Sequence, residues 1–331
     1  MTLPATRAVR DAFPGAAVTV MVKRELAGFY DGADWIDEVL PYRVGSGWDA
    51  IASQRALVRD LRRRRFDAAV IFPRSFSSAL WMALARIPRR IGYVDDARGF
   101  LLTDRHVRTP DLLQRHQVHE HLELVTRSLG APVRSTQPVV PVSLENERKM
   151  REWIASARRG RGRLVALAVS AAFGPAKEWP ASSYSELIDR LADRHEIECV
   201  LVGSPSERER CEAVAAAARC GALIAAGDTS VGELLALLSL CDGFVGNDSG
   251  GMHVAAALGV PTVGIFGSTR PLRTGPLGPW TRVVQHPIEC SPCMQRECKF
   301  GHYDCLRSIT ADRVAAALNE VVAAAGIDPK V

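Results

Sequence analysis

Short apolar runs rich in β-branched residues alternate along this chain with segments of helical pattern. The runs lie at residues 17–22, 67–73, 164–169, 197–203, 243–248 and 261–267. Strands that read as continuous apolar runs are typical of parallel sheets, because helices cover both faces of such a sheet. The alternation therefore predicts an α/β fold.

The chain is too long for one small core and is expected to form two domains. It has 331 residues, of which 47% are hydrophobic and 24% are charged. A charged stretch at residues 145–163 ends in RRGRGR, and a new strand pattern begins at Leu164. We therefore expect two doubly wound, Rossmann-like domains at residues 1–150 and 163–331. Such sheets bind ligands at the carboxyl ends of their strands, so the two domains are expected to face a cleft.

The sequence carries no pattern of a membrane span or a secretory signal. No run approaches the roughly 20 apolar residues that cross a bilayer, so we expect a cytoplasmic protein. The net charge of +5 arises from 42 basic and 37 acidic residues. This modest excess does not predict a nucleic-acid partner, although a local basic face for an anionic substrate stays open.

The segment GNDSGGMHVAAALGVP at residues 246–261 predicts a strand end, a turn and a helix start. One interpretation is a capped helix with a packed histidine. The other is a phosphate site, because glycines let a ligand approach the backbone and a helix N-terminus favours anions. The second interpretation gives as candidate residues Asp248, Ser249, Gly250, His253 and, less strongly, Gly251.

Two further strand ends carry candidate residues. The loop SAAFGPAKEWP at residues 170–180 follows a strand, and its Lys177 is a point charge suited to a diphosphate, although loop lysines are often merely solvated. The segment at residues 202–209 offers Ser206 or Glu207 to ribose hydroxyls. Its competing and preferred interpretation is a capping box between Ser204 and Glu207.

Four of the eight cysteines lie close together near the C-terminus, with His302 nearby. Their spacing is C-x2-C-x4-C-x6-C, and structural zinc, disulfides and free thiols all remain open. These four are Cys290, Cys293, Cys298 and Cys305. The histidines at 116, 119 and 121 look metal-like, but a solvated helix face is the preferred interpretation.

Taken together, residues 170–180, 227–238 and 246–271 resemble the donor domain of glycosyltransferase family 9, the ADP-heptose:lipopolysaccharide heptosyltransferases. Residues 72–104 resemble the acceptor domain of the type II members of that family. The resemblance covers nearly the whole chain. It implies a GT-B fold and an inverting, metal-independent transfer of heptose from ADP-heptose to the first heptose of the inner core, with no cofactor.

The resemblance also implies partners and roles. Lys177 matches the family residue at the donor diphosphate. Residues Asp248 to Gly250 match the turn beside the phosphate and the sugar, and His253 matches the family histidine on the helix that follows. Ser170 and Glu207 match less closely. The acceptor is a lipid A-core glycolipid, so peripheral contact with the inner membrane is expected. Basic side chains proposed for acceptor phosphates or lipid heads, or else for a solvated surface, are Arg74, Arg89, Arg90 and Arg98.

One departure from the family concerns the N-terminus. Residues 4–15 predict an amphipathic helix before the first strand, whereas family members begin with a strand and a Gly-Asp loop that carries the general base. That aspartate aligns upstream of Met1, so no catalytic base is assigned, and the first domain is expected to lack one strand. A misplaced start is the favoured explanation, and a damaged enzyme is the other. For the function, the alternatives to a heptosyltransferase are a binding-only remnant and a nucleotide-sugar epimerase or hydrolase.

Overall fold

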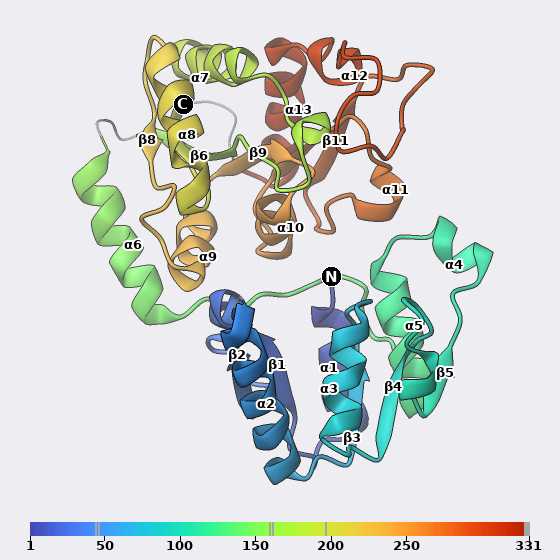
Figure 1. The fold of residues 1–331 in the computed structure, drawn as a ribbon. Helices are drawn as coiled ribbons and strands as arrows, with labels where there is room; N and C mark the ends of the chain where they lie inside the picture. The colour runs from blue at the N-terminus through green and yellow to red at the C-terminus, as the bar shows by residue number, and fades with distance from the viewer. Residues whose placement is uncertain (44, 46, 159, 161, 196, 328–331) are drawn as a thin grey trace. The chain divides into compact units, whose positions relative to one another are not determined.

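The computed structural model describes residues 1–43, 45, 47–158, 160, 162–195 and 197–327 (Figure 1). The chain divides into two compact units, Met1–Pro138 and Val139–Val331. Both contain parallel strands connected by helices, which confirms the predicted α/β class. The charged segment after residue 144 forms α6 (Leu144–Ala157), which packs against α9 (Val231–Ser239) and so belongs to the second unit.

The second unit is built on a parallel sheet with the order β11-β10-β9-β6-β7-β8 in the described part of the chain. From β6 the chain adds strands on one side and then crosses to add β9 to β11 on the other, so the order reverses between β6 and β9. In open α/β sheets this reversal is where ligands bind. The strands are β6 (Arg163–Ala168), β7 (Ile197–Leu201), β8 (Leu223–Ile224), β9 (Gly243–Asn247), β10 (Thr262–Phe266) and β11 (Thr281–Gln285).

Helices cover both faces of this sheet (Figure 1). On one face α7 (Ala181–His195), α8 (Arg208–Ala217) and α13 (Ala311–Ala324) share a core with alternate residues of β6, β7 and β10. On the other lies α10 (Gly250–Ala257), against β9, β10 and α9. Every residue of β9 and β10 is buried, which explains why both strands read as unbroken apolar runs. The remaining short elements are η3 (Pro175–Lys177), η4 (Pro205–Glu207), α11 (Pro271–Thr274) and α12 (Asp304–Arg307).

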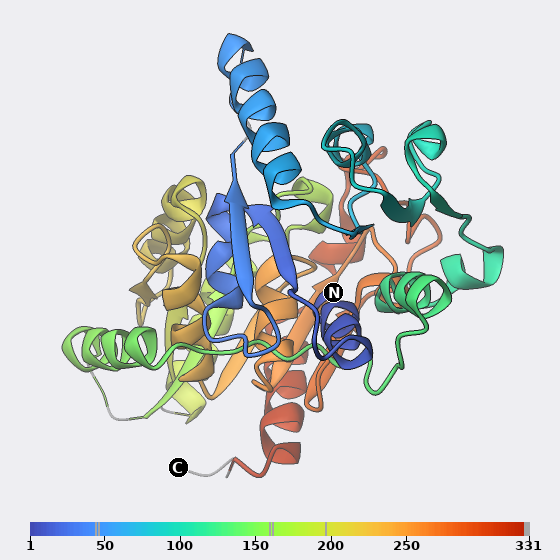
Figure 2. The same cartoon turned by 90° about the horizontal axis from the view of Figure 1, so that it is seen from below.

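The first unit begins with the predicted helix, α1 (Leu3–Ala12), which packs beside α5 (Val118–Leu129) (Figure 2). Its strands form two small parallel sheets, β1-β2 and β3-β4-β5. These strands are β1 (Thr19–Lys23), β2 (Glu38–Tyr42), β3 (Ala68–Ile71), β4 (Arg89–Tyr93) and β5 (Asp104–His106). The other elements are η1 (Arg24–Tyr30), α2 (Gly47–Arg64), α3 (Phe76–Leu84), η2 (Gly99–Leu101) and α4 (Pro110–Gln114).

Arg98 is fully buried, so the expectation that it contacts an acceptor phosphate or a lipid head is wrong. Its guanidinium donates to the carbonyl oxygens of Tyr93 and Pro73 and to the hydroxyl of Ser78. A buried guanidinium persists only where such acceptors replace water. Arg98 therefore ties together the segments that follow β3 and β4.

Arg89 and Arg90 also serve the fold of this unit. Arg89 pairs with Asp104 of the neighbouring strand, and Arg90 donates to the carbonyl oxygens of Leu101 and Ile87. Arg74 differs, because its side chain is 53% exposed while one of its nitrogens reaches the buried carboxylate of Glu120.

His121 on α5 is buried, which corrects the expectation of a solvated histidine face. Its ring packs edge-on against the ring of Phe72, with centroids 5.3 Å apart. Burial is the main reason that the pKa of His121 falls from 6.5 to about 4. His119 on α5 and His116, which lies before the helix begins, are only partly exposed.

The buried neutral His121 makes the first unit less stable at lower pH. Between pH 6.5 and 4 the unfolded chain takes up a proton that the folded protein does not, so stability falls as pH falls through this window. His121→Leu should remove this contribution. We expect the loss of unfolding free energy between pH 7 and pH 5 to be smaller in the variant by about 2 kcal/mol, measured by urea unfolding. An identical pH dependence in both proteins would contradict the buried neutral form.

Candidate functional site

The carboxyl ends of β6 and β9 bring two predicted residues together. Ala168 pairs with Gly246, so the loops that follow these strands start side by side at the point where strand order reverses. Lys177 lies at the end of η3 in the first loop, and Asp248 directly follows β9. Their Nζ and Oδ2 atoms are 2.6 Å apart. Sequence reasoning therefore placed both residues at the correct edge of the sheet.

This ion pair is held in a partly dry environment. The side chains of Lys177 and Asp248 are 13% and 4% exposed. The same carboxylate oxygen accepts hydrogen bonds from the hydroxyls of Thr269, at 2.7 Å, and Thr274, at 3.3 Å. Several donors thus hold Asp248 in one orientation, and Asp248 fixes the lysine head at the strand ends.

Helix α10 starts at Gly250 beside this pair. Its N-cap residue, Ser249, has extended backbone angles and makes no side-chain capping bond, so its hydroxyl is not used to close the helix. A Cβ atom at Gly250 would meet nothing within 4 Å, so packing of this unit does not require glycine there. His253 is half-buried one turn further along the helix. The helix start therefore offers amides and a hydroxyl to an anion.

Two buried polar groups lie at the same strand ends without a partner among the described residues. Asn247 accepts a hydrogen bond from the backbone N–H of Trp179, but its Nδ2 has no acceptor. The hydroxyl of Ser268, in the segment after β10, is also unpaired. Buried donors without acceptors are costly, so these two atoms mark this edge as one that a polar ligand or water can complete.

The other sequence candidates fall into different settings. Glu207 accepts from both the backbone N–H and the hydroxyl of Ser204, so the predicted capping box is present. Ser170 is half-buried, two residues after β6 ends, in the loop that also carries Lys177. A Cβ atom at Gly251 would make ordinary contact with the ring of Phe244 and with Ala168, so packing does not exclude a small side chain there.

The four-cysteine segment shows no arrangement typical of a metal site among the described residues. Cys290, Cys293, Cys298 and Cys305 are free thiols, and no three side chains of His, Cys, Asp or Glu gather as a metal site requires. Cys305 is buried in the core, which raises its pKa to about 11. Backbone N–H groups, first that of Tyr303, hold the pKa of the partly exposed Cys298 thiol below its usual value. The segment packs instead against the loops that follow β6 and β10.

Residues at these strand ends that sequence reasoning missed include Thr269, Phe173 and Arg296. The cation of Lys177 lies 4.8 Å from the centroid of the Phe173 ring, and the guanidinium carbon of Arg296 lies 5.5 Å from it. Thr269 could have been found, because it follows a predicted strand in the segment GSTRP. Arg296 lies in residues 290–305, the segment with the four cysteines, which we call the cysteine loop. Nothing in the local sequence indicates where this loop packs.

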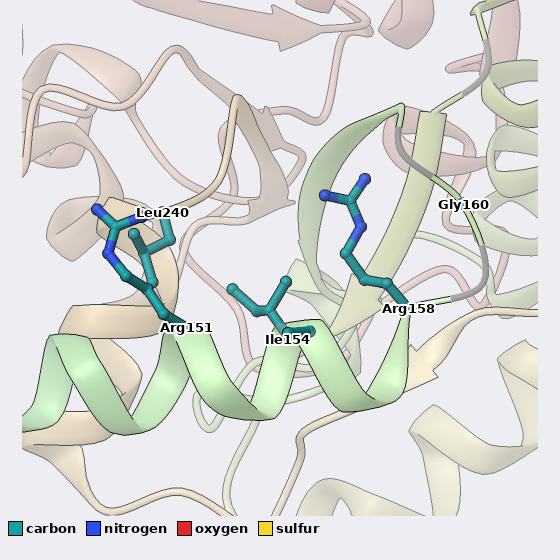
Figure 3. Close-up of a pocket in the computed structure, with 6 residues that line it drawn as sticks. Arg151, Ile154, Arg158, Gly160 and Leu240 are labelled. Carbon is teal, nitrogen blue, oxygen red and sulfur yellow. The ribbon is translucent and has the colours of Figure 1, made fainter.

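A separate hollow of about 560 Å³ lies beside α6 (Figure 3). Its lining includes Arg151 and Arg158 (Figure 3), but these guanidinium groups pair with Glu147 and Glu198. The hollow lies where β6 begins, whereas Lys177 and Asp248 lie where β6 and β9 end. It is therefore not part of the strand-end site.

The first unit gathers charge at the ends of its own strands. Glu120 is fully buried, and its carboxylate is contacted by Arg108, at 2.5 Å, and by Arg74, at 3.1 Å. Arg108 also pairs with Asp95 and lies over the ring of Tyr93. Arg74, Asp95 and Arg108 follow β3, β4 and β5 respectively. Since the Arg108 side chain is buried, Arg74 is the arginine of this cluster whose charge reaches solvent.

Comparison with known proteins gives consistent matches over nearly the whole chain. Residues 54–304 match the family described as glycosyltransferase family 9 (heptosyltransferase). Lipopolysaccharide heptosyltransferase 2 of Escherichia coli K12 is 31% identical over 96% of this chain and 92% of its own. The same enzyme of Salmonella typhimurium is 30% identical over 97% of this chain and 94% of its own. The solved E. coli ADP-heptose lipopolysaccharide heptosyltransferase II aligns with a TM-score of 0.82 and 27% identity, over 98% and 94%. These matches confirm the resemblance and the GT-B fold class.

The geometry predicts that Asp248 stabilises the second unit by neutralising Lys177. Asp248→Ala leaves a largely buried cation unpaired and should lower the free energy of unfolding by about 3 kcal/mol. Adding Lys177→Met to this variant removes the unpaired charge and should restore part of the loss. Urea unfolding of the single and double variants measures both effects.

The matched control is Arg282→Ala, which breaks the exposed pair between Arg282 and Glu320 in the same unit and should change stability little. A double variant that is less stable than Asp248→Ala alone would contradict the pairing argument.

Proposed function

The chain belongs to glycosyltransferase family 9, and we propose that it transfers heptose from ADP-heptose onto the inner core of lipopolysaccharide. Membership of the family makes it a glycosyltransferase. Its similarity to lipopolysaccharide heptosyltransferases 2 extends over nearly all of both chains, which supports the same donor and acceptor class here.

The observation that carries the donor assignment is the cluster at the ends of β6 and β9. Three groups lie together where the strand order reverses. They are Lys177, the first amides of α10 and the hydroxyl of Ser249, which makes no capping hydrogen bond. Such sheets bind nucleotides at this position, and helix starts favour phosphate oxygens. We propose that the second unit binds the diphosphate of ADP-heptose here, with His253 and Gly250 beside the sugar and Ser170 as a further donor contact. Glu207 is the less favoured ribose contact, because its carboxylate already caps η4.

The proposed chemistry follows from how charge develops during transfer. Departure of ADP increases the negative charge on the diphosphate, while the anomeric carbon becomes cation-like. Lys177 and the first amides of α10 are held at the proposed diphosphate position before the reaction, so they would stabilise the transition state more than the ground state. The proposed reaction inverts the anomeric carbon and uses these groups, without a divalent metal, to hold the leaving diphosphate.

The first unit is the proposed acceptor side. The exposed Arg74, held by the buried Glu120, offers a positive charge at the ends of the strands of that unit. A lipid A-core acceptor carries phosphates and sits in a membrane, so peripheral contact with an anionic bilayer surface follows from the proposal. Among the residues described, none of the helices has the length and apolar character of a membrane span.

The proposed activity is tested by incubating the protein with ADP-heptose and a heptosylated lipid A-core acceptor, and measuring ADP release and product mass. Release should depend on the acceptor, and Lys177→Ala should lower kcat/KM by about 100-fold, which is typical for loss of one preorganised donor.

Arg282→Ala serves as the control and should retain full activity, because its exposed ion pair lies on β11 and α13. ADP release that ignores the acceptor would argue for a hydrolase. Donor binding without turnover would instead indicate a binding-only protein.

A further inference from the structure

The cysteine loop is pinned across the ends of two strands by backbone contacts. The carbonyl oxygen of Arg296 accepts a hydrogen bond from the N–H of Ala176, at 3.0 Å, in the loop that carries Lys177. The N–H of Met294 donates to the carbonyl oxygen of Ser268, at 2.8 Å, after β10. The hydroxyl of Ser291 donates to the carbonyl oxygen of Gly267. The loop is thus fixed relative to the strand-end site before any ligand arrives.

Gly174 makes this close approach possible. Its φ of 139° is rarely adopted by other residues, and a Cβ atom there would lie 2.6 Å from the carbonyl oxygen of Arg296. A side chain at position 174 would therefore displace the backbone at Arg296. The glycine in the GPAK segment serves the docking of the cysteine loop as well as the shape of its own turn.

The side chain of Arg296 is directed to the same aromatic ring as Lys177. Its Nε donates to the carbonyl oxygen of Phe173 at 2.9 Å, and its guanidinium carbon lies 5.5 Å from the ring centroid. Lys177 lies 4.8 Å from that centroid. Cations at these distances are attracted to an aromatic face, so Phe173 holds two positive groups at one edge of the sheet.

The charge balance at this edge makes Arg296 important. Lys177 is neutralised by Asp248, so this pair contributes little net positive charge. Within the part of the chain that the structure describes, no carboxylate pairs with Arg296, and the residue is exposed. Arg296 therefore offers an uncompensated positive charge to a ligand that carries two or three negative charges. A guanidinium can also donate two parallel hydrogen bonds to phosphate oxygens.

We propose that Arg296 is a diphosphate-binding residue of the donor site, delivered by the cysteine loop and oriented by Phe173. This inference rests on the proposed function, because it assigns the nucleoside diphosphate to the edge where β6 and β9 end. It also gives the loop a role that requires no metal. The cysteine-containing fold of the loop positions one arginine against the loop after β6.

The test compares the affinity of the full chain for ADP and for adenosine, which lacks phosphate. Arg296→Met should raise the Kd for ADP by about tenfold or more, as loss of a charge-assisted hydrogen bond does, and should leave adenosine binding unchanged. Calorimetry measures the affinity for ADP, and ligand-observed NMR measures the affinity for adenosine. The effect on ADP should shrink as salt is raised, because it is electrostatic.

The matched control is Lys299→Met, which removes an exposed cation from the same loop. The ammonium of Lys299 lies over the ring of Phe300, not over that of Phe173. This variant should leave both affinities unchanged. Phe173→Leu should weaken the binding of ADP less than Arg296→Met does, because the arginine remains but is less well oriented.

The outcomes separate this inference from the proposed function. If the unaltered protein binds ADP and Arg296→Met binds it equally well, Arg296 is not a ligand contact. Equal losses for ADP and adenosine would show that the arginine only supports the fold, which also overturns the inference. An unaltered protein that binds no ADP would overturn the proposed function itself.

Discussion

The ion pair between Lys177 and Asp248 is the interaction on which the strand-end site depends. It joins the loop after β6 to the turn after β9, which are 71 residues apart in sequence but adjacent in the sheet. The hydroxyls of Thr269 and Thr274 bring the segment after β10 to the same carboxylate. Three strand ends therefore converge on one buried oxygen, and the start of α10 is held beside them.

This arrangement shows what the proposed donor site, which contains a carboxylate, needs in order to bind an anion. Asp248 orients the lysine and offsets its charge, so binding of a diphosphate needs further positive groups. In the proposed donor site the amides at the start of α10 would supply partial charge, and Arg296 would supply a full charge from a loop that no strand pattern predicts. The proposed site thus combines local strand-end geometry with one long-range docking contact at Gly174.

The sequence predicts those features that follow from local pattern. Unbroken apolar runs locate β9 and β10, and position after a strand is enough to select Lys177 and Asp248. Prediction from the sequence fails where tertiary packing decides whether a side chain is buried. His121 and Arg98 are polar residues that a single sequence places in solvent, yet the packing of α5 and of the β3 and β4 loops buries both. Arg296 was missed because the contact that places it joins segments more than a hundred residues apart.

The measurement that tests the donor site most directly is a crystal structure of the chain with ADP bound. The account predicts that the diphosphate oxygens lie within about 3 Å of Lys177 Nζ, the first amides of α10 and the Arg296 guanidinium. Binding of the diphosphate elsewhere, for example between Arg151 and Arg158 in the hollow beside α6, would contradict it.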